Sequence, residues 1–376
     1  MGAVRDSRGE TASIHGAFEV GHMAVDGIHR RAPLNGFKST SNPPDPGLIQ
    51  FPAAVYTPTR LGRPAGKDAP QPWQGSLHPM PAPSVVRTAQ AVQVWSPAKV
   101  NLHLEVLGKR ADGFHDLSTL IVPVSLHDTL EMRDDPAGGI SLECDEPALS
   151  SGPDNLVFRA AKMLRDALAP GRGARIRLMK RIPFEAGLGG GSGNAAATLL
   201  GLEALWGLRA GPGRLTEMAA ALGSDVPCFL TEGATRCEGR GERVTGVPSG
   251  TRLHMVVVKP REGLSTRDIF SRLRPGYGCE SVEEAQGALA AGDVRRLGRA
   301  LFNRLEEAAC DALDCLAPLR ARMSAAGPVG VVLTGSGSAM VALADGAAHA
   351  AALGRDYRGL STPAGPVGVF VVSTPA

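Results

Sequence analysis

The most constraining feature of the chain is residues 183–207, PFEAGLGGGSGNAAATLLGLEALWG, where five glycines precede an alanine- and leucine-rich run. Glycine loses more backbone freedom on folding than any other residue and buries no side chain, so such a run needs a reason. The following segment has strong helix formers and predicts a helix over 195–206. Residues 187–194 are therefore expected at the N-terminal end of a helix.

The N-terminal end of a helix presents backbone N–H groups and the positive end of the helix dipole, and both favour anions. The glycines would let the backbone surround a phosphate group, and Ser192 adds a hydroxyl group. The pattern is not a P-loop, because Gly193, Asn194 and Ala195 follow Ser192 where a Lys and a Ser or Thr are required. No ribose-binding acid of a dinucleotide-binding fold is obvious downstream. Taken alone, the loop fits either a phosphate site or a flexible glycine-rich turn.

Composition describes an ordinary globular chain. With 376 residues, 43% hydrophobic and 20% charged, it has room for two domains, and a formal charge of +3 is too small to argue for nucleic acid or membrane binding. Six cysteines without a CxxC pair favour a reduced, cytoplasmic interior over a disulfide scaffold or a zinc site. No apolar run reaches the roughly 18 residues of a membrane helix. We expect a cytoplasmic protein without nucleic acid or membrane partners.

The chain changes character near residue 90. Residues 1–90 are rich in Pro, Gly, Ser and Arg without a sustained apolar period, which predicts a disordered extension or a start codon assigned too far upstream. From residue 91, strand-like alternation continues on both sides of Pro97, which suggests an edge or a bulge. Asp154 is available as the N-cap of a helix, and two helices are expected after residue 281. Strands and helices mix without a βαβ repeat, which predicts an α+β fold.

Two charged residues stand in unusual surroundings. Lys99 lies in a strand-like segment, where it would face solvent or need a partner. Asp225 precedes the apolar run Val-Pro-Cys-Phe, where it would usually be a cap or turn residue. If both met at the glycine loop, the lysine would keep the aspartate ionised, and the aspartate could accept a hydroxyl proton during phosphoryl transfer.

Several motifs together resemble one family, the 4-diphosphocytidyl-2-C-methyl-D-erythritol kinases of the GHMP kinase superfamily. The resemblance covers about residues 92–376 and rests on the order and spacing of six segments: Pro97-Ala98-Lys99-Val100-Asn101, Arg110-Ala111-Asp112-Gly113-Phe114-His115, Asp154-Asn155-Leu156, Ala186-Gly187-Leu188-Gly189-Gly190-Gly191-Ser192, Gly223-Ser224-Asp225-Val226-Pro227 and Thr334-Gly335-Ser336-Gly337-Ser338.

The resemblance implies a two-domain GHMP kinase fold. Its N-terminal, ATP-binding domain, resembling the second domain of ribosomal protein S5, would span 91–245, and a ferredoxin-like C-terminal domain would span 246–376. It also implies that ATP, as its magnesium complex, phosphorylates the 2-hydroxyl group of a substrate carrying a cytidine diphosphate group, in the non-mevalonate route to isoprenoid precursors. The protein would be a monomer or a homodimer.

The same resemblance assigns roles to individual residues. Asp225 would be the catalytic base and Lys99 its partner, and residues 186–192 would surround the phosphates, with Ser192 the candidate contact to magnesium. The adenosine part of ATP would contact Asn155 and Lys180. The cytidyl substrate would contact Asn101, Phe114, His115 and Phe270, with the two phenylalanines stacking on the base and His115 at its polar edge.

Three positions depart from the family pattern. Gly193 stands where a second serine is common, Phe114 replaces a commoner tyrosine, and Arg304 replaces a frequent aspartate in an Asn-Asp-Leu-Glu segment. None of them removes Lys99 or Asp225, so we expect an active enzyme whose nucleotide affinity is the property most exposed to these changes.

Two other readings stay open. The acceptor could be another small alcohol, as in homoserine or mevalonate kinases, or the chain could be a non-catalytic nucleotide-binding regulator with the same fold. RNA binding is a weaker idea, because no basic patch with interleaved aromatic residues is present.

Overall fold

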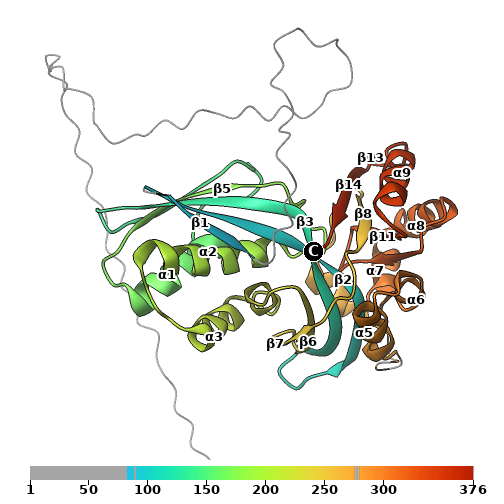
Figure 1. Cartoon of the computed structure of the whole chain (residues 1–376), viewed down its shortest axis with the longest axis horizontal. Coiled ribbons are helices and arrows are strands. Elements are labelled where there is room, and N and C mark those ends of the chain that lie inside the picture. The colour runs from blue at the N-terminus through green and yellow to red at the C-terminus, as the bar shows by residue number, and fades with distance from the viewer. Residues whose placement is uncertain (1–82, 89, 275, 277, 279, 376) are drawn as a thin grey trace, which may run out of the picture. The chain divides into compact units, whose positions relative to one another are not determined.

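Two long antiparallel strands, β2 (Val92–Lys109) and β3 (His115–Asp134), form the centre of the larger sheet in the computed structural model (Figure 1). The structure describes residues 83–88, 90–274, 276, 278 and 280–375, so most of the predicted N-terminal extension lies outside the described residues. The register of β2 and β3 shifts between Pro97 and Ala98. This irregularity confirms the interruption expected at Pro97, which cannot donate a ladder hydrogen bond.

Six further strands complete the larger sheet in the described part of the chain. The order is β1-β2-β3-β5-β4, with β6 paired to the first half of β3, β7 paired to β6, and β9 paired to β2. Their bounds are β1 (Ser84–Arg87), β4 (Ile140–Cys144), β5 (Ala174–Met179), β6 (Ala234–Gly239), β7 (Arg243–Val247) and β9 (Phe302–Asn303).

Strand β1 corrects the boundary expected at residue 91. Its four residues pair antiparallel with Val92 to Trp95 of β2, and Arg87 Nη1 donates to the carbonyl oxygen of Ala204 at 3.1 Å. Residues 84–87 therefore belong to the sheet, because the backbone edge of β2 provides hydrogen-bond partners that composition does not reveal.

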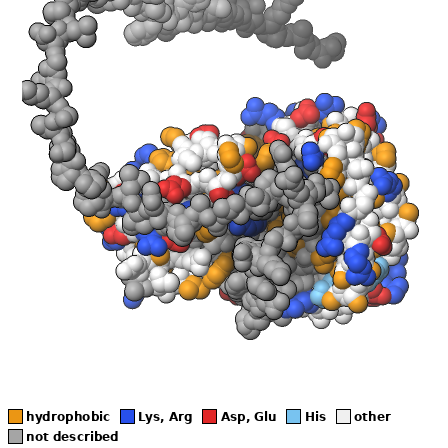
Figure 2. Space-filling model, turned by 90° about the horizontal axis from the view of Figure 1, so that it is seen from above, with side chains coloured by type: hydrophobic (Ala, Val, Ile, Leu, Met, Phe, Trp, Pro, Cys, Tyr) orange, Lys and Arg blue, Asp and Glu red, His pale blue; other side chains and the backbone are white. Residues whose placement is uncertain are grey.

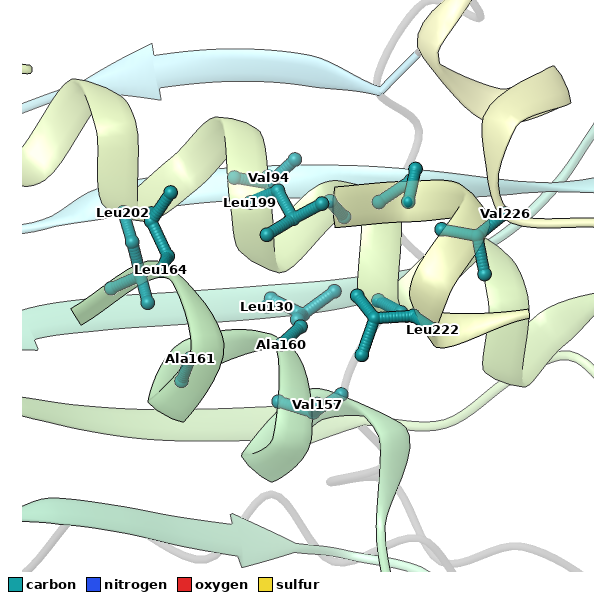
Figure 3. Close-up of a cluster of buried hydrophobic side chains, with 14 of the residues drawn as sticks. Val94, Leu130, Val157, Ala160, Ala161, Leu164, Leu199, Leu202, Leu222 and Val226 are labelled. Atoms are coloured by element: carbon teal, nitrogen blue, oxygen red, sulfur yellow. The ribbon is translucent and has the colours of Figure 1, made fainter. Parts of the chain in front are cut away.

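Helices cover one face of this sheet. They are α1 (Leu156–Leu168), α2 (Gly190–Trp206) and α3 (Pro212–Leu222), and the 3₁₀ helix η1 (Pro227–Leu230) follows them (Figure 1). Figure 3 shows their apolar side chains meeting those of the strands, with Leu199 of α2 near Val94 of β2. Gly201 lets α2 lie this close to the sheet, because a Cβ atom at this position would lie 2.6 Å from the sulfur of Met132.

Two helix starts differ from expectation. The helix predicted over 195–206 begins at Gly190, so Gly190, Gly191 and Gly193 belong to its first turn and only Gly187 and Gly189 lie in the loop before it. The N-cap of α1 is Asn155, whose Oδ1 accepts from the amide of Val157 at 2.9 Å, so the prediction of Asp154 as the cap was wrong by one residue. Asp154 instead accepts from the hydroxyl group of Ser150 at 2.6 Å.

The C-terminal part contains a four-stranded antiparallel sheet ordered β10-β11-β8-β14. In chain order these strands are the second, third, first and fourth, and helices follow the first and third. This is the βαββαβ arrangement of ferredoxin-like folds. The elements are β8 (His254–Lys259), α4 (Thr266–Ser271), α5 (Val282–Ala291), α6 (Val294–Arg299), α7 (Glu306–Ala312), α8 (Leu316–Ala325), β10 (Gly330–Leu333), β11 (Met340–Ala344), α9 (Ala347–Tyr357), β12 (Ser361–Thr362), β13 (Gly365–Pro366) and β14 (Gly368–Ser373).

The prediction of two helices after residue 281 was wrong in number, because four helices, α5 to α8, lie between that residue and β10. Gly292 ends α5 in a left-handed conformation (φ +69°), Asp293 caps α6, and β9 then interrupts the helical pattern. Pairing of β9 with β2 overrides the helix propensity of the surrounding residues.

The α+β prediction is confirmed. The described residues belong to one compact unit, so the domain boundary expected near residue 245 stays a prediction. Within those residues, no helix combines the length and the apolar character needed to cross a membrane. Figure 2 shows acidic and basic side chains interspersed on the visible part of one face.

Candidate functional site

The glycine loop leads into α2 through two residues in the left-handed backbone conformation, which only glycine adopts easily. Gly187 has φ +72° and Gly189, the N-cap of α2, has φ +69°. The amides of Gly190, Gly191 and Ser192 therefore start the helix without partners in a preceding helical turn, which is the geometry of an anion site.

A second turn, residues 334–338 between β10 and β11, packs against this loop. A Cβ atom on Gly187 would lie 1.9 Å from the carbonyl oxygen of Thr334, and one on Gly335 would lie 2.7 Å from the carbonyl oxygen of Gly187. The two glycine segments, far apart in sequence, thus approach backbone to backbone with no room for side chains between them.

Lys99 and Asp225 meet beside the loop, as the sequence suggested. The Lys99 ammonium lies 3.6 Å from Asp225 Oδ2 and donates to Asn101 Oδ1 at 2.6 Å. The Lys99 side chain is 5% exposed, whereas that of Asp225 is 42% exposed. Asn101 Nδ2 in turn donates to the hydroxyl group of Thr119 at 2.8 Å. The buried Lys99 ammonium is therefore held in place by the side-chain amide of Asn101, and its carboxylate partner Asp225 is accessible to solvent.

A cavity of about 480 Å³ joins these groups. Of the site residues predicted from the sequence, all but Phe114 and His115 line it. They are Lys99, Asn101, Asn155, Lys180, Ala186, Gly187, Leu188, Gly189, Gly190, Gly191, Ser192, Asp225 and Phe270.

Lys180 is tied to a buried carboxylate that sequence reasoning missed. The fully buried Asp128 accepts from the Lys180 ammonium, and its other oxygen accepts from the amides of Arg181 at 2.6 Å and Ile182 at 2.8 Å. The segment that leads into the glycine loop is thus fastened to β3. The signal in the sequence was a carboxylate in the middle of an apolar strand, which requires a partner.

Asn155 lines the cavity, but its side chain is already engaged. Besides capping α1, it donates from Nδ2 to the carbonyl oxygen of Ser150 at 2.7 Å. A role in adenosine binding stays a prediction, and it would have to be compatible with this capping function.

The aromatic residues predicted to hold a base are only partly brought together. The rings of His115 and Phe270 lie 5.1 Å apart, and Phe270 lines the cavity. Phe114 is 50% exposed, and the guanidinium of Arg240 lies 5.0 Å from its ring centre. Burial, together with the charge of Lys109, lowers the pKa of His115, so its imidazole stays neutral to a lower pH than a free histidine.

The departure at Gly193 has a packing explanation. A Cβ atom there would lie 2.8 Å from the Ser96 hydroxyl and 3.2 Å from the Phe229 ring, and Gly193 does not line the cavity. A side chain at this position would face the interior beneath α2, so the absence of a serine here leaves the cavity wall unchanged.

Two cysteines that sequence reasoning did not assign to the site, Cys228 and Cys237, line the same cavity as Asp225. Cys228 donates to the carbonyl oxygen of Asp225 at 3.0 Å and interacts with the thiol of Cys237. This interaction and burial raise the pKa of Cys228, while the same hydrogen bond lowers that of Cys237. All described cysteines are free.

The cavity wall offers few protein ligands for a hard cation such as Mg²⁺. Ser192 and Asp225 place oxygen atoms on its wall, which suits Mg²⁺, but the described residues contain no cluster of three or more His, Cys, Asp or Glu arranged for a metal. These donors fit a magnesium ion carried mainly by the phosphates of a nucleotide.

Comparisons with known proteins agree with this geometry. Residues 155–233 match the family model described as the GHMP kinases N terminal domain. The chain is 41% identical over 249 residues to 4-diphosphocytidyl-2-C-methyl-D-erythritol kinase of Pelotomaculum thermopropionicum, which covers 65% of this chain and 86% of that protein. It is 44% identical over 248 residues to the kinase of the same name from Symbiobacterium thermophilum, with 65% and 87% covered.

Solved structures show the same relationship. A crystal structure of 4-(cytidine 5'-diphospho)-2C-methyl-D-erythritol kinase superposes with a TM-score of 0.63 at 36% identity and covers 76% of this chain and all of that chain. Homoserine kinase from Cytophaga hutchinsonii, at 19% identity and a TM-score of 0.60 over 77% of this chain and 96% of its own, shares the fold. The chain has the GHMP kinase fold and belongs to the 4-diphosphocytidyl-2-C-methyl-D-erythritol kinase family.

Proposed function

We propose that this chain transfers the γ-phosphoryl group of ATP to the 2-hydroxyl group of 4-diphosphocytidyl-2-C-methyl-D-erythritol, giving the 2-phosphate and ADP. In a cell with the non-mevalonate route, this reaction would serve the synthesis of isoprenoid precursors. The observation that carries the proposal is the Lys99–Asp225 pair, 3.6 Å apart, on the wall of the cavity that the glycine loop also lines.

The carboxylate is suited to act as the general base. Asp225 is 42% exposed, so it can reach an acceptor hydroxyl group, and the buried Lys99 ammonium lies 3.6 Å from its Oδ2. As the hydroxyl oxygen attacks the γ-phosphorus, Asp225 accepts the proton. The bond from the γ-phosphorus to the bridging oxygen breaks, and ADP leaves with that oxygen.

The glycine loop stabilises the charge on the transferred group. The amides at the start of α2 would donate to phosphate oxygens, and the positive end of the helix would add to the effect. Bound Mg²⁺ would neutralise phosphate charge, and Ser192 would hold it through its hydroxyl group. Lys180 and Asn155 line the cavity wall and would face the adenosine of ATP.

The cytidyl group is the part of the substrate that distinguishes this acceptor from other small alcohols. We assign its recognition to Phe270, His115 and Phe114, where aromatic rings offer stacking surfaces and a neutral imidazole can meet the polar edge of a base. Asn101, held beside Lys99, would orient the erythritol part.

An ADP-release assay tests the proposal directly. The purified chain with magnesium and ATP should turn over the cytidyl substrate but not homoserine or mevalonate, and cytidine nucleotides should compete. Asp225→Asn, which keeps the shape and removes the base, should lower turnover by roughly two to four orders of magnitude while ATP binding is kept. Unchanged turnover of this variant would remove Asp225 from the mechanism. ATP binding without turnover of any of the three acceptors would favour a regulator.

A further inference from the structure

Residues 335–337 of the turn at 334–338 line the cavity, but the turn has no role in the mechanism above. It lies against Asn101 and Lys99 at two points. Thr334 Oγ1 accepts from the amide of Asn101 at 3.1 Å, and a Cβ atom on Gly335 would lie 3.2 Å from the Lys99 ammonium nitrogen. A displacement of this turn would therefore reach Lys99 directly.

One buried amide holds the turn in place. Asn303, in β9, donates from Nδ2 to the carbonyl oxygens of Leu333 and Gly335, each at 2.8 Å, and accepts at Oδ1 from the amide of Leu305 at 2.9 Å. Asn303 is 5% exposed. A carboxylate of the same size could still accept from Leu305, but it could not donate to two carbonyl oxygens.

The residue three positions later supports the same strand end. Glu306 Oε2 accepts from the amide of Leu333 at 3.0 Å, and its other oxygen lies 2.5 Å from Arg320 Nε. Leu333 is thus bound through its carbonyl oxygen by Asn303 and through its amide by Glu306. The end of β10 is fixed by both side chains just before the turn begins.

Asn303 is itself positioned by an ion pair at the next residue. Arg304 donates to both oxygens of the buried Glu105, at 2.8 and 2.9 Å, and its amide donates to the carbonyl oxygen of Leu104 at 2.8 Å. Burial opposes ionisation of Glu105, but the hydrogen bonds from Arg304 and from the amides of Glu280 and Val106 lower its pKa overall. The arginine that departs from the family pattern is therefore the partner of a charge on β2, four residues beyond Asn101.

From these contacts we infer that Asn303 is a positioning residue of the phosphoryl-transfer site. It holds the turn at 334–338 against the Lys99 ammonium and the Asn101 backbone, and so determines where Lys99 stands relative to Asp225. The expected effect on kcat rests on the proposed function. The placement of the Lys99 side chain can be tested without measuring turnover.

The first test is kinetic. In Asn303→Asp, kcat per nucleotide-binding site should fall about 10- to 100-fold, because small misplacements of catalytic groups cost this much, while the KM for ATP stays within about threefold. Thr334→Val, which removes the acceptor for Asn101, should behave alike, and Thr334→Ser should restore kcat. The double variant of Asn303→Asp and Thr334→Val should lose little more than either single variant, since both act through one turn.

The second test needs no substrate. Lys99 is 4% exposed, so an amine-acylating reagent should label it slowly, and peptide mass spectrometry can follow the rate. Asn303→Asp and Thr334→Val should each accelerate this labelling severalfold. Gln90→Glu makes the same amide-to-carboxylate change at an exposed residue that does not line the cavity, and it should alter neither labelling nor kcat.

The outcomes separate the two ideas. If the unaltered chain does not turn over the cytidyl substrate but Asn303→Asp exposes Lys99, the proposed function fails and the positioning role stands. The inference is overturned if Asn303→Asp leaves Lys99 labelling unchanged, or if its kcat loss disappears once activity is divided by the number of nucleotide-binding sites.

Discussion

Replacement of Asp128 by asparagine should destabilise the protein strongly, although Asp128 lies outside the catalytic pair. The side chain is fully buried and binds three donors, two backbone amides and the Lys180 ammonium, whose side chain is only 8% exposed. Asparagine keeps the shape and one acceptor oxygen, but it turns an N–H₂ group toward the ammonium or toward the amides.

The expected cost follows from these contacts. Removing one partner of a buried ion pair costs about 3–5 kcal/mol, because the remaining charge is left without compensation. A protein of this kind is stable by about 5–15 kcal/mol in total, so the loss is a large fraction. With a denaturant dependence of about 4 kcal/mol per molar, the midpoint in guanidinium chloride should fall by roughly 1 M.

Chemical denaturation followed by fluorescence or circular dichroism measures this midpoint. Asp166→Asn is the matched control, since Asp166 pairs with Lys162 and Arg165 at an exposed site and its replacement should leave the midpoint unchanged. The double variant of Asp128→Asn and Lys180→Met should recover part of the loss, because no unpaired charge remains. A cost below about 1 kcal/mol for Asp128→Asn, or full additivity with Lys180→Met, would refute the reasoning.

Three further predictions concern the loop, the substrate site and the N-terminal boundary. Gly187→Ala should abolish measurable turnover or prevent folding, because φ is +72° and the new Cβ atom would lie 1.9 Å from the Thr334 carbonyl oxygen; turnover within twofold of the unaltered chain would contradict the close approach. The lowered pKa of His115 predicts a KM for the cytidyl substrate that is constant down to pH 6.5 and rises only below it, and His115→Gln should flatten this profile; a rise that begins above pH 6.5 would argue against a neutral imidazole. Deleting residues 1–82 should leave the thermal midpoint unchanged, whereas deleting residues 1–88 removes β1 and should lower it, as calorimetry can show; equal midpoints would mean that β1 adds no stability.

Much of the secondary structure was predictable because its signals are local. Strand alternation on both sides of Pro97 identified the segment of β2, and the helix formers after the glycine run identified most of α2. Errors arose where a distant partner decides the conformation. Strand β9 forms because β2 offers an edge. Helix α2 extends to Gly190 because Gly190 fits against the Lys180 side chain and the N-cap Gly189 fits against that of Lys99.

The sequence by itself determined the chemistry available to this protein. A glycine run before a helix, a lysine in a strand and an aspartate beside an apolar run made a phosphate site with a base one possible interpretation, and the family resemblance selected it. Only the tertiary structure decided which charges become partners. Lys180 pairs with Asp128, Arg304 with Glu105, and Asn303 with the turn beside Lys99, across 52, 199 and about 30 residues of chain. The strength of a charge or hydrogen-bond contact depends on separation and burial in space, and a local sequence pattern can indicate a buried charge but not which distant residue becomes its partner.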